Sequence, residues 1–167
     1  MRLMLLSFIL IILSACAGKT DKDFFVYSST GMNHDFSVKY NFQDTLYMST
    51  RFPEKATFYA LLKKEDHSRI KNLIKEINFD KHDSVYEDST LRDGWGYKFY
   101  NYRDAKAKSI YVYTTTPPKD LDTIARQFEQ ILMQRNFNTI TKEVDFGNLN
   151  HILLPTPPPP PSRIIIN

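Results

Sequence analysis

The chain has 167 residues, of which 42% are hydrophobic and 14% aromatic, and its formal net charge at pH 7 is +3. Basic and acidic residues are interspersed without a run of five like charges, which argues against a nucleic-acid-binding protein. The only cysteine is Cys16, so disulfides within the chain and metal sites built from several thiolates are excluded. We therefore expect one domain that is held together by its hydrophobic core.

Residues 1–16 form the most distinctive stretch of the sequence. The apolar run of about 11 residues from Leu3 to Leu13 is too short for a membrane-spanning helix of ~20 residues but typical of a signal peptide. It ends in Leu13-Ser14-Ala15-Cys16, which resembles the lipobox of bacterial lipoproteins. The resemblance implies removal of residues 1–15, a diacylglycerol on the Cys16 thiol and acylation, for example by palmitate, of the new amino terminus. An ordinary secretory leader, or an uncleaved helix that ends at Cys16, is the alternative.

Residues 16–23 are expected to be the lipidated cysteine and a short polar tether. The residue after Cys16 is Ala17 rather than aspartate. By resemblance to Gram-negative lipoproteins, this indicates the outer membrane rather than retention at the inner one. The expected partner is thus the membrane, bound through acyl chains that together give stable anchoring.

The first part of the domain is predicted to form a meander of antiparallel strands and then a helix. Alternating or β-rich runs, separated by turns, predict strands at 24–29, 35–40, 45–52 and 57–62. An apolar stripe at helical spacing, with Asp66 as a candidate N-cap, then predicts the helix; the stripe is Ile70, Leu73, Ile74 and Ile77. Residues 80–94 read as a long polar loop.

The second part repeats the pattern with a β-hairpin and a helix. Aromatic residues alternate over 95–102, and isoleucine and valine alternate with tyrosine over 108–115. Pro117 and Pro118 lead into a helix whose apolar stripe is Leu121, Ile124, Phe128, Ile131 and Leu132. One further strand is predicted within 139–146. The order of about ββββ-α-ββ-α predicts an α+β fold, an antiparallel sheet with two amphipathic helices on one face.

The order of elements in the domain resembles an uncharacterised family of bacterial domains. The resemblance lies in a run that begins at Thr57 and continues through a helix ending at Phe79, the acidic loop with Tyr86 and Asp93, a hairpin, a proline turn and a closing helix. Those domains occur largely in secreted proteins and lipoproteins. The resemblance covers residues ~24–135 and implies no activity. Members commonly carry a Cys-Pro-Tyr type segment near the first hairpin, which 29–36 lacks here.

The chain is accordingly divided into a signal peptide (1–15), a tether (16–23), one α+β domain (24–147) and a proline-rich tail (148–167). Pro157 to Pro161 predict polyproline II, with Ile164 to Ile166 after it. We expect residues 155–167 to lie outside the core. Leu154-Pro155-Thr156 begins like a cell-wall sorting signal, but the glycine, hydrophobic span and basic end of that signal are missing.

Motifs for catalysis or metal binding are weak. Ser68 and Lys71 fit the S-x-x-K spelling of penicillin-binding enzymes without its companion motifs, so a solvated helix face is the better interpretation. His34, His67, His82 and His151 have no metal-site spacing and are interpreted as surface or loop residues. The acidic loop around His82 could bind Ca²⁺ but lacks the EF-hand order, and a solvated loop is preferred. No catalytic residue, metal or cofactor is assigned.

The aromatic hairpin gives the main functional indication. If Ile110 and Val112 face the helices, Tyr111 and Tyr113 must face away. Together with Tyr100 and Tyr102 they form the candidate binding face, for an envelope protein or a glycan. Cross-strand pairing that only stabilises the sheet, or cover from the C-terminal segment, is the alternative. The sequence thus favours a lipid-anchored, non-enzymatic envelope protein, with an envelope-polymer hydrolase as the alternative.

Overall fold

The computed structural model describes residues 23–153, which form one sheet and two helices. The elements follow one another as β1 (Phe24–Gly31), β2 (His34–Tyr40), β3 (Thr45–Phe52), β4 (Ala56–Leu61), α2 (Lys64–Glu76), β5 (Val85–Glu87), β6 (Gly96–Arg103), β7 (Lys106–Tyr113), α3 (Lys119–Met133) and β8 (Asn138–Ile140). The signal peptide, Cys16 and residues 154–167 lie outside the described residues.

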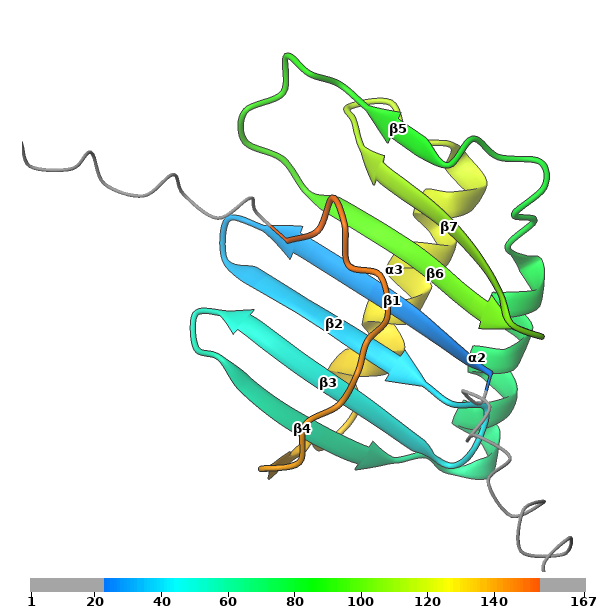
Figure 1. The fold of residues 1–167 in the computed structure, drawn as a ribbon, viewed down its shortest axis with the longest axis vertical. Helices are drawn as coiled ribbons and strands as arrows, with labels where there is room; N and C mark the ends of the chain where they lie inside the picture. Colours follow the sequence, from blue (N-terminus) through cyan, green and yellow to red (C-terminus); the bar gives the residue numbers. More distant parts are fainter. Residues whose placement is uncertain (1–22, 154–167) are drawn as a thin grey trace, which may run out of the picture.

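The sheet has eight strands in the order β5-β7-β6-β1-β2-β3-β4-β8 (Figure 1). The α+β class is confirmed. A strictly antiparallel sheet is wrong, because β5 pairs with β7 in parallel, with Val85 opposite Tyr111. The short β8 adds a further edge strand, antiparallel to β4.

Strand β5 lies in the stretch that was expected to be only a polar loop. It has three residues, and the Tyr86 side chain packs against the main core. Val85 and Glu87 are exposed on either side of this one inward residue. Three residues are too few for an alternating pattern to be recognised in the sequence.

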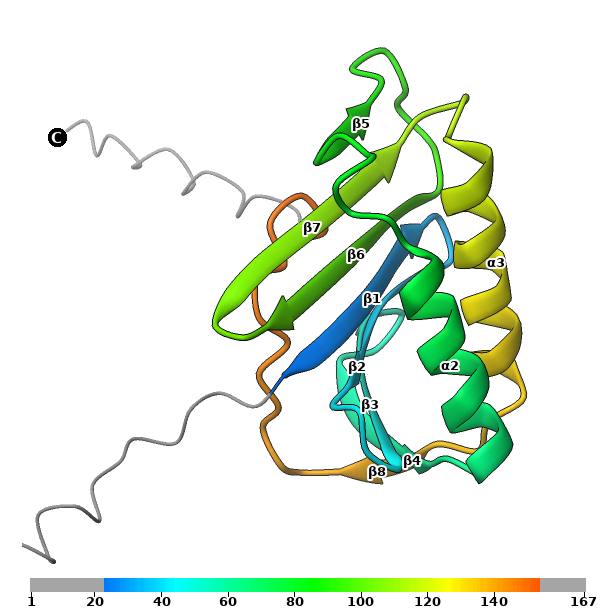
Figure 2. The same ribbon diagram turned by 90° about the vertical axis from the view of Figure 1, so that its right-hand side faces the viewer.

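The two faces of the sheet are covered differently (Figure 2). Helices α2 and α3 lie together against one face, which we call the helix face. The segment 141–153, which we call the strap, runs across the opposite face, the strap face, from β8 toward β6 and β7 (Figure 1). The described chain therefore stays packed on the sheet as far as Ile152, five residues beyond the expected domain end at 147.

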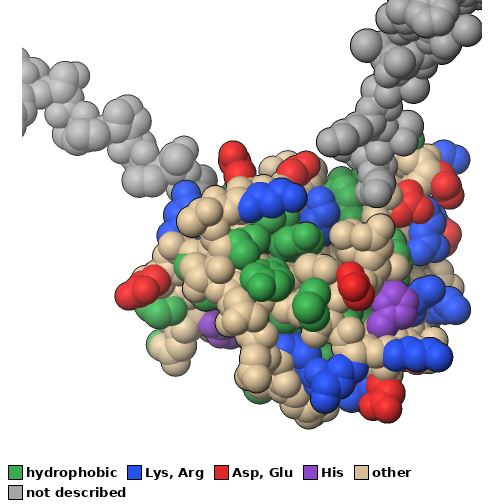
Figure 3. Space-filling view, turned by 90° about the horizontal axis from the view of Figure 1, so that it is seen from below, with side chains coloured by type: hydrophobic (Ala, Val, Ile, Leu, Met, Phe, Trp, Pro, Cys, Tyr) green, Lys and Arg blue, Asp and Glu red, His purple; other side chains and the backbone are tan. Residues whose placement is uncertain are grey.

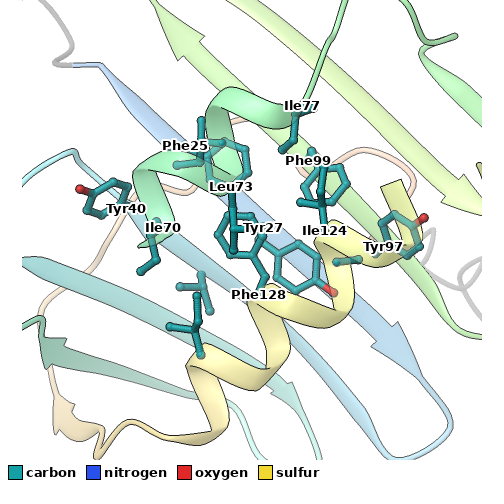
Figure 4. Close-up of a cluster of buried hydrophobic side chains, with 14 of the residues drawn as sticks. Phe25, Tyr27, Tyr40, Ile70, Leu73, Ile77, Tyr97, Phe99, Ile124 and Phe128 are labelled. Atoms are coloured by element: carbon teal, nitrogen blue, oxygen red, sulfur yellow. The ribbon is translucent and has the colours of Figure 1, made fainter. Parts of the chain in front are cut away.

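The main core fills the helix face, and Phe128 of α3 lies at its centre (Figure 4). Its ring stacks on Phe25 and Tyr27 of β1, at centroid distances of 5.4 and 5.5 Å. Strand residues on this face alternate with residues on the strap face, as the pleat requires. The predicted apolar stripes of both helices are buried here, which confirms the helical periodicity.

Asp66 is not the N-cap of its helix. Helix α2 begins one turn earlier, with Lys63 at the cap, and places Asp66 in the first turn. The Asp66 carboxylate is buried and accepts a bond from Arg135 Nη1 at 2.6 Å. A capping residue and an acid in the first turn look alike in sequence, since both suit the positive end of the helix dipole.

Candidate functional site

The expected binding tyrosines lie on the strap face, but the strap covers part of this surface. Tyr111 is only 6% exposed, and its ring stacks on His151 of the strap at a centroid distance of 5.0 Å. Tyr113 is half-buried, beside Gly94 and Gly96. Both side chains thus point away from the helices and line a hollow of about 800 Å³ at the end of the strap, although Tyr111 is almost closed off from solvent.

Tyr100 and Tyr102 belong to a second, smaller cluster beneath the strap. Phe24 stacks on Tyr102 at 5.2 Å and meets Tyr100 at 5.8 Å, and Phe146 of the strap packs against this group. Gly147 lets the strap approach closely. Its φ is +67°, and a Cβ there would come within 2.7 Å of the Tyr100 ring.

A buried lysine ties the strap to the sheet. Lys98 of β6 is 3% exposed, and its Nζ donates to the backbone carbonyls of Asn148 and Asn150 at 3.0 and 2.9 Å. Burial lowers the pKa of Lys98, because an ammonium loses hydration beneath the strap. The two carbonyl dipoles stabilise the charge of the Lys98 ammonium, and no carboxylate lies at hydrogen-bonding distance from it among the described residues.

The row of residues opposite Lys98 is small and polar. Ser28 lies directly across from Lys98 and bonds to Ser37 at 2.7 Å. Arg51 bonds to Ser37 at 3.0 Å and forms a bidentate pair with Asp35. The middle of the strap face is therefore occupied by mutually satisfied polar groups, which leaves little of it free for a ligand.

A more open site lies between α3 and the β1–β2 hairpin. Two adjoining hollows, which we call together the α3 groove, share His34 and Glu129 as common walls. The first, the Trp hollow, has a volume of about 460 Å³ and includes Trp95 and Arg126. The second, the apolar hollow, has a volume of about 330 Å³ and is lined otherwise by Phe36, Met48, Leu132, Met133 and Phe137.

Behind the shared wall lies a buried serine. Ser29 is 0% exposed, and its Oγ lies 2.9 Å from His34 Nε2, 3.0 Å from Glu129 Oε1 and 2.8 Å from Trp95 Nε1. Strands β1 and β2, the residue just before β6 and helix α3 each supply part of this network. It fixes the three groove residues relative to one another.

The Ser29–His34 contact does not have the geometry of a hydrolytic triad. In a triad the acid binds the imidazole nitrogen that faces away from the serine. Here Glu129 contacts Ser29 itself, and the indole N–H of Trp95 donates to the same hydroxyl. One hydroxyl can donate one bond and accept two, so three partners saturate it. A saturated and fully buried oxygen is poorly placed to attack a substrate.

Glu129 is oriented toward the groove by two hydroxyls. Tyr27 and Ser29 both donate to Oε1, each at 3.0 Å. Within residues 23–153 no donor bonds to Oε2, and Glu129 lines both hollows. Burial, and next the charge of Glu129, raise the pKa of Tyr27 well above its usual value, so this phenol keeps the proton it donates. The result is a positioned carboxylate with one oxygen available to a ligand.

The charges of the Trp hollow favour a cationic ligand. Asp93 and Glu129 supply two carboxylates against one guanidinium, that of Arg126. Arg126 is itself paired with Asp122 at 3.0 Å and lies over the Trp95 ring at 5.2 Å. Because Arg126 is compensated outside the hollow, the hollow keeps a negative surplus.

The other polar candidates have local partners. Ser68 donates to the Lys64 carbonyl of its own helix at 3.0 Å. His67 bonds to Tyr40, and His82 bonds to Tyr86 and Asp120, with the His82 side chain only 6% exposed. The prediction of a solvated loop is therefore wrong for the His82 side chain. No group of three or more potential metal ligands is gathered anywhere in the described part of the chain.

The groove was missed by sequence reasoning because its members are far apart in the chain. Ser29 and His34 are joined by a hairpin, but Glu129 lies 100 residues beyond Ser29. The one usable signal was the single tryptophan, at the start of a strand beside a glycine.

On the face that Figure 3 shows, acidic and basic side chains are interspersed around hydrophobic ones, so this face has no patch of a single charge.

None of the helices within residues 23–153 is both long and apolar enough to cross a membrane. No family model, no curated protein and no solved structure matches this chain. The resemblances to lipoproteins and to the uncharacterised domain family therefore remain expectations.

Proposed function

We propose that this protein is a lipid-anchored binding module of the bacterial cell envelope, and that its ligand site is the α3 groove. The observation that carries the proposal is the orientation of Glu129, whose Oε1 is held by two buried hydroxyls while Oε2 is left to a ligand. Preorganised polar groups beside an apolar hollow are typical of binding sites. The hollow at the end of the strap, which Tyr111 and Tyr113 line, is the weaker candidate, because Tyr111 is only 6% exposed.

The ligand that suits this groove is an extended peptide segment of an envelope protein. The apolar hollow accepts aliphatic side chains, and the carboxylates of the Trp hollow accept a cationic side chain next to them. A glycan would leave the apolar hollow unused. The proposed partner is thus a protein segment that combines a lysine or arginine with neighbouring aliphatic residues.

Anchoring is proposed from the lipobox and is tested at its cysteine. Cys16→Ala should abolish incorporation of a fatty-acid analogue, because the thiol that accepts the diacylglycerol is absent. Labelling is measured after growth with the analogue, with Ser14→Ala as a control that keeps the cysteine. Undiminished labelling of Cys16→Ala would refute the anchor.

The groove is tested by photo-crosslinking in the native membrane. A photoreactive residue replaces Met133, which is 83% exposed and lines the apolar hollow. As a control, the same photoreactive residue replaces Gln127, which is exposed on the same helix outside the groove. We expect a defined envelope adduct from position 133 and not from 127. Equal crosslinking from both positions, or none from 133, would contradict the proposal.

The alternative is a hydrolase of envelope polymers, which the closeness of Ser29 and His34 favours. A fluorophosphonate probe tests it, since the probe labels activated serines. Binding alone predicts no labelling, because Ser29 is buried and its hydroxyl is saturated. Labelling that Ser29→Ala removes would establish the hydrolase instead.

A further inference from the structure

We propose that the C-terminal segment of this same chain, residues 154–167, docks in the α3 groove, with Arg163 against Glu129 and Ile164 to Ile166 in the apolar hollow. The inference rests on the proposed function, since it names an occupant of the same groove. It makes the segment an internal ligand that an external peptide must displace.

The described chain ends beside the groove. Leu153 lines the hollow of about 800 Å³ at the end of the strap, together with Tyr111 and Tyr113. Gly31, Met32, Asp93 and Gly94 line this hollow and also the Trp hollow. The segment that follows Leu153 therefore starts one wall away from the groove.

The segment is long enough to reach the shared wall. Ten residues, 154–163, lead from Leu153 to Arg163. At about 3.1 Å per residue in polyproline II they span roughly 31 Å, which is twice the radius of gyration of ~14 Å for a domain of this size. Prolines also lower the entropy that is lost on docking, because their backbone is already restricted.

The chemistry of the segment matches the two hollows in order along the chain. Arg163 is its only charged side chain, and the Trp hollow has a surplus of carboxylate. Three isoleucines follow at once, and the apolar hollow adjoins the Trp hollow through Glu129. An extended chain would place Arg163 at Glu129 and the isoleucines toward Phe137 and Met133.

The single tryptophan supplies a reporter in the full-length protein. If the segment passes Trp95, then Arg163→Glu and Ile165→Asp should expose the indole and increase its quenching by acrylamide, whereas Ser162→Ala should not. Both changes lie outside the packed residues 23–153, so the fold should persist, and far-UV circular dichroism checks this. Quenching that is unchanged in both variants would overturn the inference.

A disulfide tests the register directly. Ile165→Cys is combined with Met133→Cys in the groove or with Gln127→Cys on the same helix outside it, and peptide mapping identifies the bonded pair. We expect the 133–165 bond to form about tenfold faster than 127–165, equivalent to a preference of about 1.4 kcal/mol. Equal rates, no bond to 133, or a bond that joins two copies would overturn docking within one chain.

The two proposals fail in distinguishable ways. An envelope adduct from position 133 without the 133–165 disulfide would retain the binding groove and reject the internal ligand. The disulfide without any envelope adduct would retain the docked segment and reject the external partner.

Discussion

The two faces of the sheet are built from the same strands but are closed by different means. On the helix face, two amphipathic helices bury large side chains around Phe128. On the strap face, one irregular segment buries a smaller aromatic group and is held by Lys98 through backbone carbonyls. The difference teaches that an aromatic strand pattern shows which face a side chain occupies, but not whether that face is open.

The largest expected effect is a loss of stability when a phenylalanine is truncated, and it should differ between the two faces. Phe128→Ala should lower the free energy of unfolding by about 3–5 kcal/mol, because it leaves a cavity at the centre of the core. Phe146→Ala, under the strap, should cost less, since the strap can open locally while the sheet stays folded. Chemical denaturation measures both. Equal losses would show that the strap is as integral to folding as the helices.

A smaller effect is expected where the strap approaches the sheet most closely. Gly147→Ala adds a Cβ at positive φ, within 2.7 Å of the Tyr100 ring, and should destabilise strap docking by about 1–3 kcal/mol. Thermal unfolding and proteolysis of the strap report the loss. Gly31→Ala, whose nearest neighbour is the His34 side chain at 3.0 Å, gives a comparison outside the strap. A Gly147→Ala protein as stable as wild type would mean that the strap does not hold this position.

The smallest effect is a pH dependence. Burial raises the pKa of Tyr111, under the strap, to about 12, and that of Tyr40, on the helix face, also to about 12. A raised phenol pKa in the folded state gives stability that is present below pH 10 and lost between pH 10 and 12. Tyr111→Phe should therefore lose stability less steeply over this range than wild type.

Between pH 10 and 12, the pH slopes of the unfolding free energy of wild type and Tyr111→Phe should differ by less than about 1.4 kcal/mol per pH unit. That value is the limit for one titrating group. The lowered pKa of Lys98 acts in the opposite direction, since stability rises with pH from that pKa up to 10.5, but this contribution is common to both proteins. Urea unfolding at pH 8 and pH 11 measures the difference. Parallel pH profiles would mean that the Tyr111 hydroxyl is already hydrated and that the strap is open.

The helix face was predictable because its signals are local and periodic. The stripe from Leu121 to Leu132 repeats at helical spacing, and Ile110 and Val112 alternate along β7 as a half-buried strand requires. Such patterns specify which side of an element is buried without knowledge of its partner. The α+β class follows from them directly.

The strap and the groove were not predictable because they depend on distant contacts between irregular segments. Residues 141–153 have no periodicity, and their anchor, Lys98, lies in another element about 50 residues away. Lysine is rarely buried, so nothing in the sequence indicates that Lys98 lies beneath another segment. Similarly, nothing near Glu129 in sequence indicates that Ser29 and Tyr27 fix its carboxylate.

Hydrogen–deuterium exchange of the full-length protein tests most directly whether the strap closes its face and leaves the α3 groove as the ligand site. The amides of Ile152 and Leu153, both bonded to the Leu149 carbonyl, should exchange well below free-peptide rates but faster than the amides of β1. Free-peptide exchange across the strap, residues 141–153, with the sheet still protected, would contradict the account. Tyr100 and Tyr111 would then be open, and the strap face would replace the groove as the binding surface.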